Sequence, residues 1–237
     1  SFAGLALSLT GCPEETTEPP DDGGSDGSTV CKIPYSGDEN ADIELSIVTL
    51  NPDYKAHPLV SGGDTSILIP PQGGRVIFVG VRARNLDPCA VKLSGALRDP
   101  ATMATHLDTR TINMDVGADG WATSDETDIS TFSNVPVCGN TWASTDIFDQ
   151  TFKLIVSVTD RSGKKATATL DVVPRCDETK VENGQDVQKD CLCICKQGYV
   201  LHGGNCYGPR VCVNGHHGAA AQPRISQIKL QAVGGLI

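Results

Sequence analysis

The sequence predicts a mainly β protein, an antiparallel β-sandwich followed by a small disulfide-rich module. Apolar and polar residues alternate with period two over much of 31–175, and clusters of Gly, Pro, Asn and Asp separate these runs. Six of the ten cysteines crowd into 176–212. No 3.6-residue amphipathic pattern stands out in 31–175, which favours two packed antiparallel sheets over helical layers.

The chain begins with nine uncharged, mostly apolar residues, typical of the hydrophobic region of a signal peptide. They are too few to cross a bilayer. The motif Leu9-Thr10-Gly11-Cys12 follows and resembles the lipobox of bacterial lipoproteins. In that family the cysteine receives diacylglycerol, so the resemblance implies a signal peptide over 1–11 and lipidation of Cys12. The alternative is a buried strand or helix start that ends in Gly-Cys by chance.

An acidic segment follows the lipobox. Residues 13–30 contain six acids, no base and almost no apolar side chain, so we expect 12–30 to be a lipidated, disordered tether. The lipid would make a membrane the first partner of the chain. In the lipoproteins that this motif resembles, Asp after the cysteine retains the protein at the inner membrane. Pro13 departs from that signal, which favours the outer membrane or cell surface of the envelope.

Strands are predicted at 43–47, 75–84 and 91–97, and a hairpin at 152–172 turns through Asp160-Arg161-Ser162-Gly163. This hairpin resembles the closing strands of immunoglobulin-like bacterial surface modules. The resemblance implies an immunoglobulin-like β-sandwich over 31–175, although the Cys, Trp, Cys spacing of antibody domains is missing.

Ten cysteines indicate an oxidising compartment and disulfides, since a reducing cytosol would leave so many thiols unpaired. We expect Cys89 to pair with Cys138 across loops or sheets. The alternative joins Cys31 to Cys176, at the two ends of the sandwich. Lipidation of Cys12 leaves an odd number, so one thiol is expected to be free or to pair between chains. The remaining disulfide candidates are Cys191, Cys193, Cys195, Cys206 and Cys212.

Residues 176–212 are too few for a large core and should depend on cross-links. The run from Cys193 through Cys195 and Gly198-Tyr199 to Cys206 resembles the second half of an epidermal-growth-factor-like (EGF-like) module. That resemblance implies a Cys195–Cys206 pair, although the spacing of the preceding cysteines departs from the family. A zinc site is the alternative, drawing on His202, His216 and His217 as well. The tail, 213–237, is glycine-rich at first and compatible with one more strand near 228–232.

The acidic loop 115–126 has the oxygen ligands that calcium prefers. Asp115, Asp119 and Glu126 occupy positions one, five and twelve, and Gly120 occupies position six. Neither flank has the helical pattern that an EF-hand requires. The alternative is a solvated acidic loop around a tight glycine turn. Calcium is therefore the one cofactor that the sequence suggests.

The motifs of common enzymes are missing from the sequence: it has no nucleophile elbow, His-Glu-x-x-His helix or phosphate-binding glycine loop. A formal charge of −10, without a run of Lys and Arg, argues against nucleic acid as a partner. These features favour a non-catalytic surface binding or adhesion module for an unknown protein or glycan. Alternatives are an accessory subunit of an envelope complex, a calcium-dependent binding module, and a hydrolase whose carboxylates assemble from distant loops.

Overall fold

The structure is a computed structural model that describes residues 31–182, 184–209, 212–213 and 216–217. The chain divides into two units, Ser1–Lys32 and Ile33–Ile237, and the elements below belong to the second. Cys12, the predicted signal peptide and tether, and the strand expected near 228–232 lie outside the described residues. Among the described residues, no helix has the length and apolar character needed to span a bilayer.

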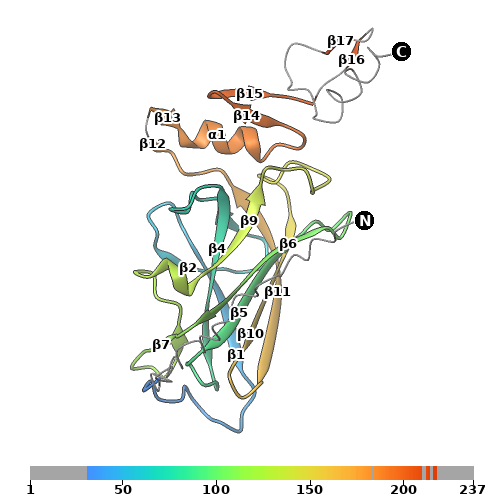
Figure 1. Ribbon diagram of the computed structural model, residues 1–237. Coiled ribbons are helices and arrows are strands. Elements are labelled where there is room, and N and C mark those ends of the chain that lie inside the picture. Colours follow the sequence, from blue (N-terminus) through green and yellow to red (C-terminus); the bar gives the residue numbers. More distant parts are fainter. Residues whose placement is uncertain (1–30, 183, 210–211, 214–215, 218–237) are drawn as a thin grey trace, which may run out of the picture. The chain divides into compact units, whose positions relative to one another are not determined.

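Two face-to-face sheets form the sandwich (Figure 1), which confirms the predicted fold class. In the first sheet the order is β2-β1-β4-β8-β7, and β9 pairs with β4 further along the same strand. Its strands are β1 (Glu44–Leu50), β2 (Ala56–Pro58), β4 (Arg75–Arg84), β7 (Asp115–Val116), β8 (Ala122–Thr123) and β9 (Ser133–Cys138). The short 3-10 helix η1 (Ile129–Thr131) leads into β9.

The second sheet has the order β3-β11-β10-β5-β6. Every pairing in it is antiparallel except that of β3 with β11, which is parallel. Its strands are β3 (Gly63–Ser66), β5 (Val91–Arg98), β6 (Thr105–Ile112), β10 (Phe152–Thr159) and β11 (Lys165–Arg175). The predicted terminal hairpin is therefore confirmed as β10 and β11. At one edge Asp108 of β6 bridges the sheets, since its carboxylate accepts the Asn134 N–H of β9 at 2.7 Å.

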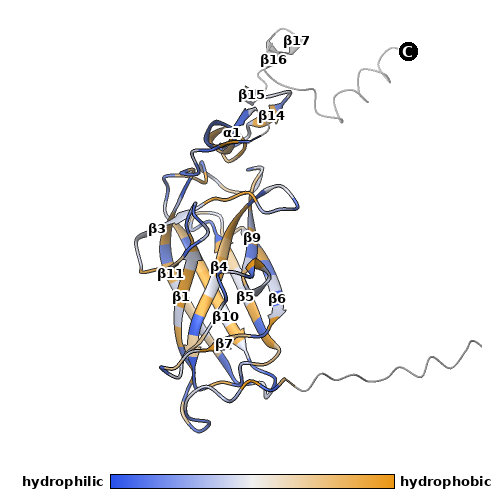
Figure 2. Ribbon diagram, turned by 90° about the vertical axis from the view of Figure 1, so that its left-hand side faces the viewer, coloured by the Kyte–Doolittle hydropathy of each residue, from blue (hydrophilic) through white to orange (hydrophobic). Residues whose placement is uncertain are grey.

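The main core lies between the sheets and explains the alternation along the strands (Figure 2). Inward-facing residues of β5 and β10, such as Leu93, Leu97 and Val156, are fully buried, while their neighbours face solvent. Strand β4 differs, since nearly all of it is buried. Ile77 and Val79 enter the main core, whereas Val76 and Phe78 join a second cluster on the opposite side of β4. That cluster contains Leu50, Leu68, Val76, Phe78 and Phe132.

The cysteine-rich module after the sandwich is small. Its elements are β12 (Val181–Glu182), β13 (Gln185–Asp186), α1 (Val187–Ile194), β14 (Val200–His202) and β15 (Asn205–Tyr207), followed by the paired strands β16 (Cys212–Val213) and β17 (His216–His217). Asp186 begins the helix, because its carboxylate accepts the Lys189 N–H at 3.0 Å and satisfies a donor of the first turn.

The disulfides differ from both expected pairs and from the alternative. Cys138 pairs with Cys195, Cys176 with Cys191, and Cys193 with Cys206. The predictions of Cys89–Cys138, Cys31–Cys176 and the EGF-like Cys195–Cys206 are therefore wrong. Cys31 and Cys89 are disulfide-bonded as well. The side chain of Cys212 lies outside the described part.

One of these pairs fastens the module to the sandwich. Cys138 ends β9, and Cys195 directly follows α1, so one disulfide joins the first sheet to the helix. Hydrogen bonds add to it: the Asn140 and Ile147 N–H groups donate to the carbonyls of Ile194 and Cys195, each at 3.0 Å. The short module is thus cross-linked to the sandwich as well as within itself.

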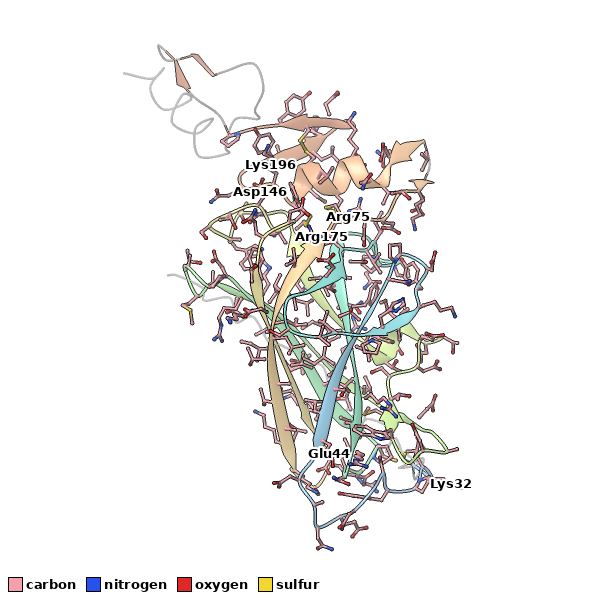
Figure 3. The ribbon with its side chains drawn as sticks, turned by 180° about the vertical axis from the view of Figure 1, so that it is seen from behind. Lys32, Glu44, Arg75, Asp146, Arg175 and Lys196 are labelled. Atoms are coloured by element: carbon pink, nitrogen blue, oxygen red, sulfur yellow. A yellow bond between two sulfur atoms is a disulfide. The ribbon has the colours of Figure 1, made fainter. Side chains whose placement is uncertain are left out.

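Arg75 is a buried cation where the module meets β4 (Figure 3), with a side chain only 4% exposed. One guanidinium nitrogen lies 3.4 Å from the carboxylate of Glu178, which is equally buried. The other donates to the Val187 carbonyl at the start of α1, at 2.7 Å. Lys180 also contacts Glu178, at 2.7 Å. A buried charge needs such partners, because leaving it unpaired costs several kcal/mol.

Asp99 is a buried carboxylate that connects two loops. It accepts hydrogen bonds from the Ala101 N–H at 2.8 Å, the Thr102 hydroxyl at 3.0 Å and the Ser144 N–H at 2.6 Å. Burial by itself raises the pKa of Asp99, but these donors outweigh it and hold the pKa well below the ordinary value of 3.8. The ionised carboxylate therefore stabilises the folded state.

We predict that Asp99→Asn lowers the free energy of unfolding at neutral pH by about 2 kcal/mol, because an amide nitrogen would face a backbone donor. In the wild type, the stabilisation by Asp99 is complete above the ordinary pKa of 3.8 and is lost as the pH falls towards the lower folded-state pKa. Urea unfolding across acidic pH should thus show a shallower pH dependence for the variant. Equal slopes for both proteins would contradict this role.

Candidate functional site

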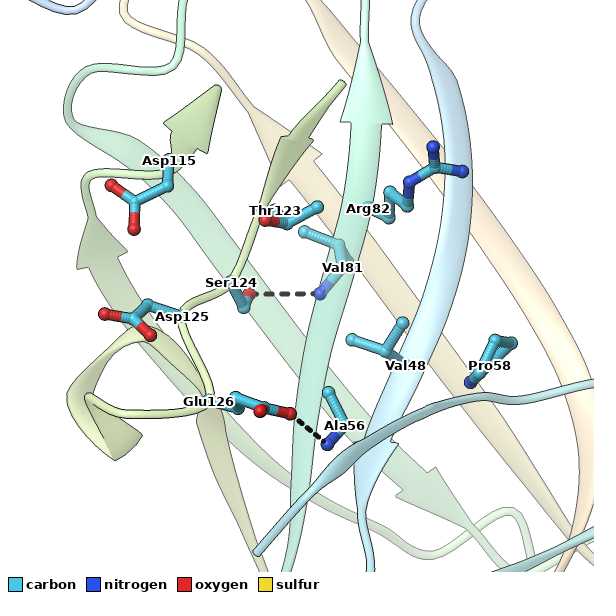
Figure 4. Close-up of a pocket in the computed structure, with 10 residues that line it drawn as sticks. All are labelled: Val48, Ala56, Pro58, Val81, Arg82, Asp115, Thr123, Ser124, Asp125 and Glu126. Atoms are coloured by element: carbon cyan, nitrogen blue, oxygen red, sulfur yellow. Dashed lines mark hydrogen bonds between the residues drawn. The ribbon is translucent and has the colours of Figure 1, made fainter. Parts of the chain in front are cut away.

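An open groove of about 370 Å³ lies on the outer face of the first sheet (Figure 4). Five strands and the segment after β8 contribute to it, although they are far apart in the sequence. The lining residues are Val48, Ala56, Pro58, Val81, Arg82, Asp115, Thr123, Ser124, Asp125 and Glu126. The floor is thus partly aliphatic, and acids and hydroxyls surround it. This combination is typical of a binding site that takes an amphipathic group.

The floor is shaped by a glycine. Gly80 of β4 lies opposite Val48 of β1, and the ring of Phe132 covers the place where a side chain would stand. A Cβ atom at position 80 would lie 2.5 Å from a ring carbon of Phe132, which is shorter than any ordinary contact. The glycine therefore lets the second hydrophobic cluster pack tightly against the outer face of β4.

Hydrogen bonds hold residues 124–126, the acidic wall of the groove, against the first sheet (Figure 4). The Ser124 N–H donates to the Val81 carbonyl at 2.9 Å, and the Val81 N–H donates to the Ser124 hydroxyl at 3.1 Å. Glu126 reaches across the groove, where its carboxylate accepts the Ala56 N–H at 2.9 Å and contacts the Lys55 ammonium at 3.0 Å. The wall is consequently fixed at both ends.

The charges of the groove do not cancel. Two contacts lower the pKa of Glu126 and keep it ionised. The larger effect comes from the Ala56 N–H, and the smaller from the Lys55 ammonium. Arg82 is paired with Asp119, which lies outside the groove. Asp115 and Asp125 have no cationic partner among the described residues; the Asp125 carboxylate accepts only from Thr127. Two carboxylates are left to give the groove a negative charge.

The two tryptophans of the chain are both engaged within the fold. The guanidinium groups of Arg82 and Arg84 lie 4.4 and 4.9 Å from the ring centre of Trp121. Trp142 stacks on His106 with a centroid distance of 4.4 Å, and its indole N–H donates to the Val137 carbonyl. Neither ring stands free as a platform for stacking sugars.

The predicted calcium ligands are only partly brought together. Asp115 and Glu126 line the groove, whereas Asp119 does not. One oxygen of Asp119 accepts the Trp121 N–H and the other contacts Arg82, and these partners lower the pKa of Asp119. Both oxygens of Glu126 are also occupied. The flanks form strand β6 on one side and the short 3-10 helix η1 with strand β9 on the other, so neither is the α-helix of an EF-hand, and calcium binding stays a prediction.

The potential zinc ligands are consumed by disulfides. The sulfur atoms of Cys176, Cys191 and Cys195 lie within 4.8 Å of one another. All three belong to the Cys176–Cys191 and Cys138–Cys195 pairs, and a sulfur in a disulfide is not the thiolate that zinc requires. In this oxidised form, the cluster therefore has no thiolate ligands for zinc.

Sequence reasoning identified Asp115 and Glu126 but missed the rest of the groove. Val48, Ala56 and Pro58 precede the acidic loop by more than fifty residues, and only the folded sheet brings them beside it. No histidine, cysteine or lysine occurs among the lining residues, so the groove offers carboxylates and hydroxyls for binding. In comparisons with family models, curated proteins and solved structures, none matches this chain.

Proposed function

We propose that this chain is the extracytoplasmic body of a lipid-anchored envelope protein, attached through Cys12, and that it acts as a non-catalytic binding or adhesion module. The groove on the first sheet is its binding site. The observation that carries the proposal is the combination of an aliphatic floor with two carboxylates, Asp115 and Asp125, that lack a cationic partner in the described residues. The resemblance of Leu9-Thr10-Gly11-Cys12 to a lipobox and the disulfides support the extracytoplasmic location.

The lining favours a ligand with a positive charge on an apolar stem. A lysine or arginine side chain of a partner protein has this form, because its methylene groups can cover Val48 and Pro58 while its charged end meets the carboxylates. Charge-assisted hydrogen bonds to carboxylates are stronger than those between neutral groups. A protein ligand that presents a basic side chain is therefore the class that the groove fits best.

The proposal predicts binding of short peptides that carry lysine or arginine, measured by fluorescence anisotropy over a labelled peptide library. Asp115→Asn combined with Asp125→Asn should weaken this binding roughly tenfold or more, since each lost charge-assisted hydrogen bond is worth about 1.5–3 kcal/mol. The double variant should fold normally, because neither carboxylate forms an ion pair in the described structure.

The matched control is Glu39→Gln combined with Asp42→Asn. Both residues are exposed and lie outside the groove, so the control changes the net charge by the same amount. It should bind like the wild type. Equal weakening in both double variants, or no binding of any basic peptide, would overturn the proposed site.

A further inference from the structure

The outer face of the second sheet carries two lysines in one row across three strands. Thr159 of β10 lies opposite Lys92 of β5 on one side and opposite Lys165 of β11 on the other. Residues that are directly opposite each other point to the same face of a sheet. Since neighbouring strands lie 4.7–4.9 Å apart, the Cα atoms of the lysines are roughly 10 Å apart, with the threonine between them.

Hydroxyl groups fill the space beside these lysines. Ser157 lies opposite Ser94 in the next row, and the Thr109 hydroxyl of β6 donates to the Ser94 hydroxyl at 3.0 Å. The side chains enclose a shallow depression of about 240 Å³. Its lining consists of Lys92, Ser94, Thr109, Ser157, Thr159 and Lys165. This polar depression lies on a different sheet from the groove.

The charge of this face is opposite to that of the whole chain. Neither Lys92 nor Lys165 has an ion-pair partner within the described ranges. The rows through residues 153–159 of β10 also contain Arg98 and Lys153, and their single acid is Asp171, which pairs with Lys153 at 2.6 Å. These rows therefore have an excess of three positive charges, although the chain carries −10.

We propose that this face binds an acidic polysaccharide, whose carboxylate or sulfate groups lie between Lys92 and Lys165. The ammonium groups supply the charge, and the serine and threonine hydroxyls can donate to and accept from sugar hydroxyls. The rows span roughly 20 Å along the strands and 14 Å across four strands, which accommodates several sugar units of an extended chain. This site is independent of the groove on the first sheet.

The composition of the face favours a polysaccharide over an anionic membrane. Insertion at a lipid surface depends on a broad band of exposed apolar side chains. On these rows only Leu107, which is 60% exposed, is a large and well-exposed apolar side chain; Ile155, two strands away in the same row, is half-buried. Apart from Ala96, the remaining positions are hydroxyls and charges, which match a hydrated polyanion.

The test measures binding of the full chain to polygalacturonate, dextran sulfate and neutral dextran by isothermal titration calorimetry. We expect binding to the two polyanions and not to neutral dextran. Lys92→Gln combined with Lys165→Gln should weaken polyanion binding roughly tenfold. The remaining binding should depend less on salt, because fewer counterions are released. Circular dichroism should confirm that this variant folds, as both lysines are exposed.

The matched control, Lys189→Gln combined with Lys196→Gln, makes the same change in net charge away from this face. It should bind the polyanions like the wild type. Equal weakening in both double variants would reveal binding through net charge alone and overturn the site. The inference is also overturned if neither polyanion binds, or if vesicles of phosphatidylcholine and phosphatidylglycerol bind while the polysaccharides do not.

Discussion

Replacing Arg75 by methionine is expected to lower the free energy of unfolding by about 3–5 kcal/mol, the cost of breaking a buried ion pair. The variant leaves the carboxylate of Glu178 buried and also removes the hydrogen bond to the Val187 carbonyl. Lys180 remains beside Glu178, so we expect a loss in the lower half of that range. Urea unfolding with the disulfides intact measures the difference.

The double variant Arg75→Met with Glu178→Leu is the informative control. It removes both charges, so stability should recover to near the wild-type value, as is common when apolar residues replace a buried pair. A loss below 1 kcal/mol in the single variant would show that the pair does not hold the module against β4.

Removing the Cys138–Cys195 disulfide by alanine at both positions should cost about 4 kcal/mol. The two cysteines are 57 residues apart, and cross-linking a long loop restricts the unfolded chain more than cross-linking a short one. The Cys193–Cys206 pair, with a separation of 13, should cost about 3 kcal/mol when removed in the same way. Urea unfolding of both double variants under non-reducing conditions compares the two costs.

Removal of Cys138–Cys195 should also change the local stability of the module. Because this pair joins β9 to the end of α1, its removal should allow the module to open before the sandwich unfolds. Hydrogen exchange should then be faster in α1, with β5 and β10 still protected. Faster exchange throughout the sandwich, or unchanged exchange in α1, would contradict the proposed link.

Strands with one buried face could be predicted from the sequence. The alternation in β5 and β10 follows from a sheet that is covered on one side and solvated on the other. Strand β4 shows no such alternation and is predicted from its β-branched residues instead. Its apolar run is continuous because both of its faces are covered. Phe78 and Val76 face a second cluster, so both sides of this strand are buried.

The disulfide pairs could not be predicted, because sequence spacing does not determine which ends of the fold meet. The predicted partner of Cys138 is Cys89, a residue of the sandwich itself. In the structure Cys138 ends β9, beside the place where the module docks. The pair implied by the EGF-like resemblance is wrong for the same reason, since Cys195 forms its disulfide with Cys138 of the sandwich.

Both proposed binding faces depend on tertiary arrangement. Lys92 and Lys165 are separated by more than seventy residues, and only the register of β5, β10 and β11 places them in one row. The formal charge of −10 therefore does not indicate that one face of the fold has an excess of positive charge. The acids of 115–126 were visible as a cluster, but Asp119 is held by Arg82 of β4, a partner that no local pattern shows.

The disulfides Cys176–Cys191 and Cys138–Cys195 also bear on proteolysis. A peptidase that cuts the backbone anywhere within 177–190 leaves the downstream fragment attached, because Cys176–Cys191 and Cys138–Cys195 both bridge the break. Such a nicked molecule would gain only the mass of one water and would stay in one piece until a reductant arrives. Shedding of the C-terminal fragment thus requires two chemically different events, hydrolysis of a peptide bond and reduction of two disulfides.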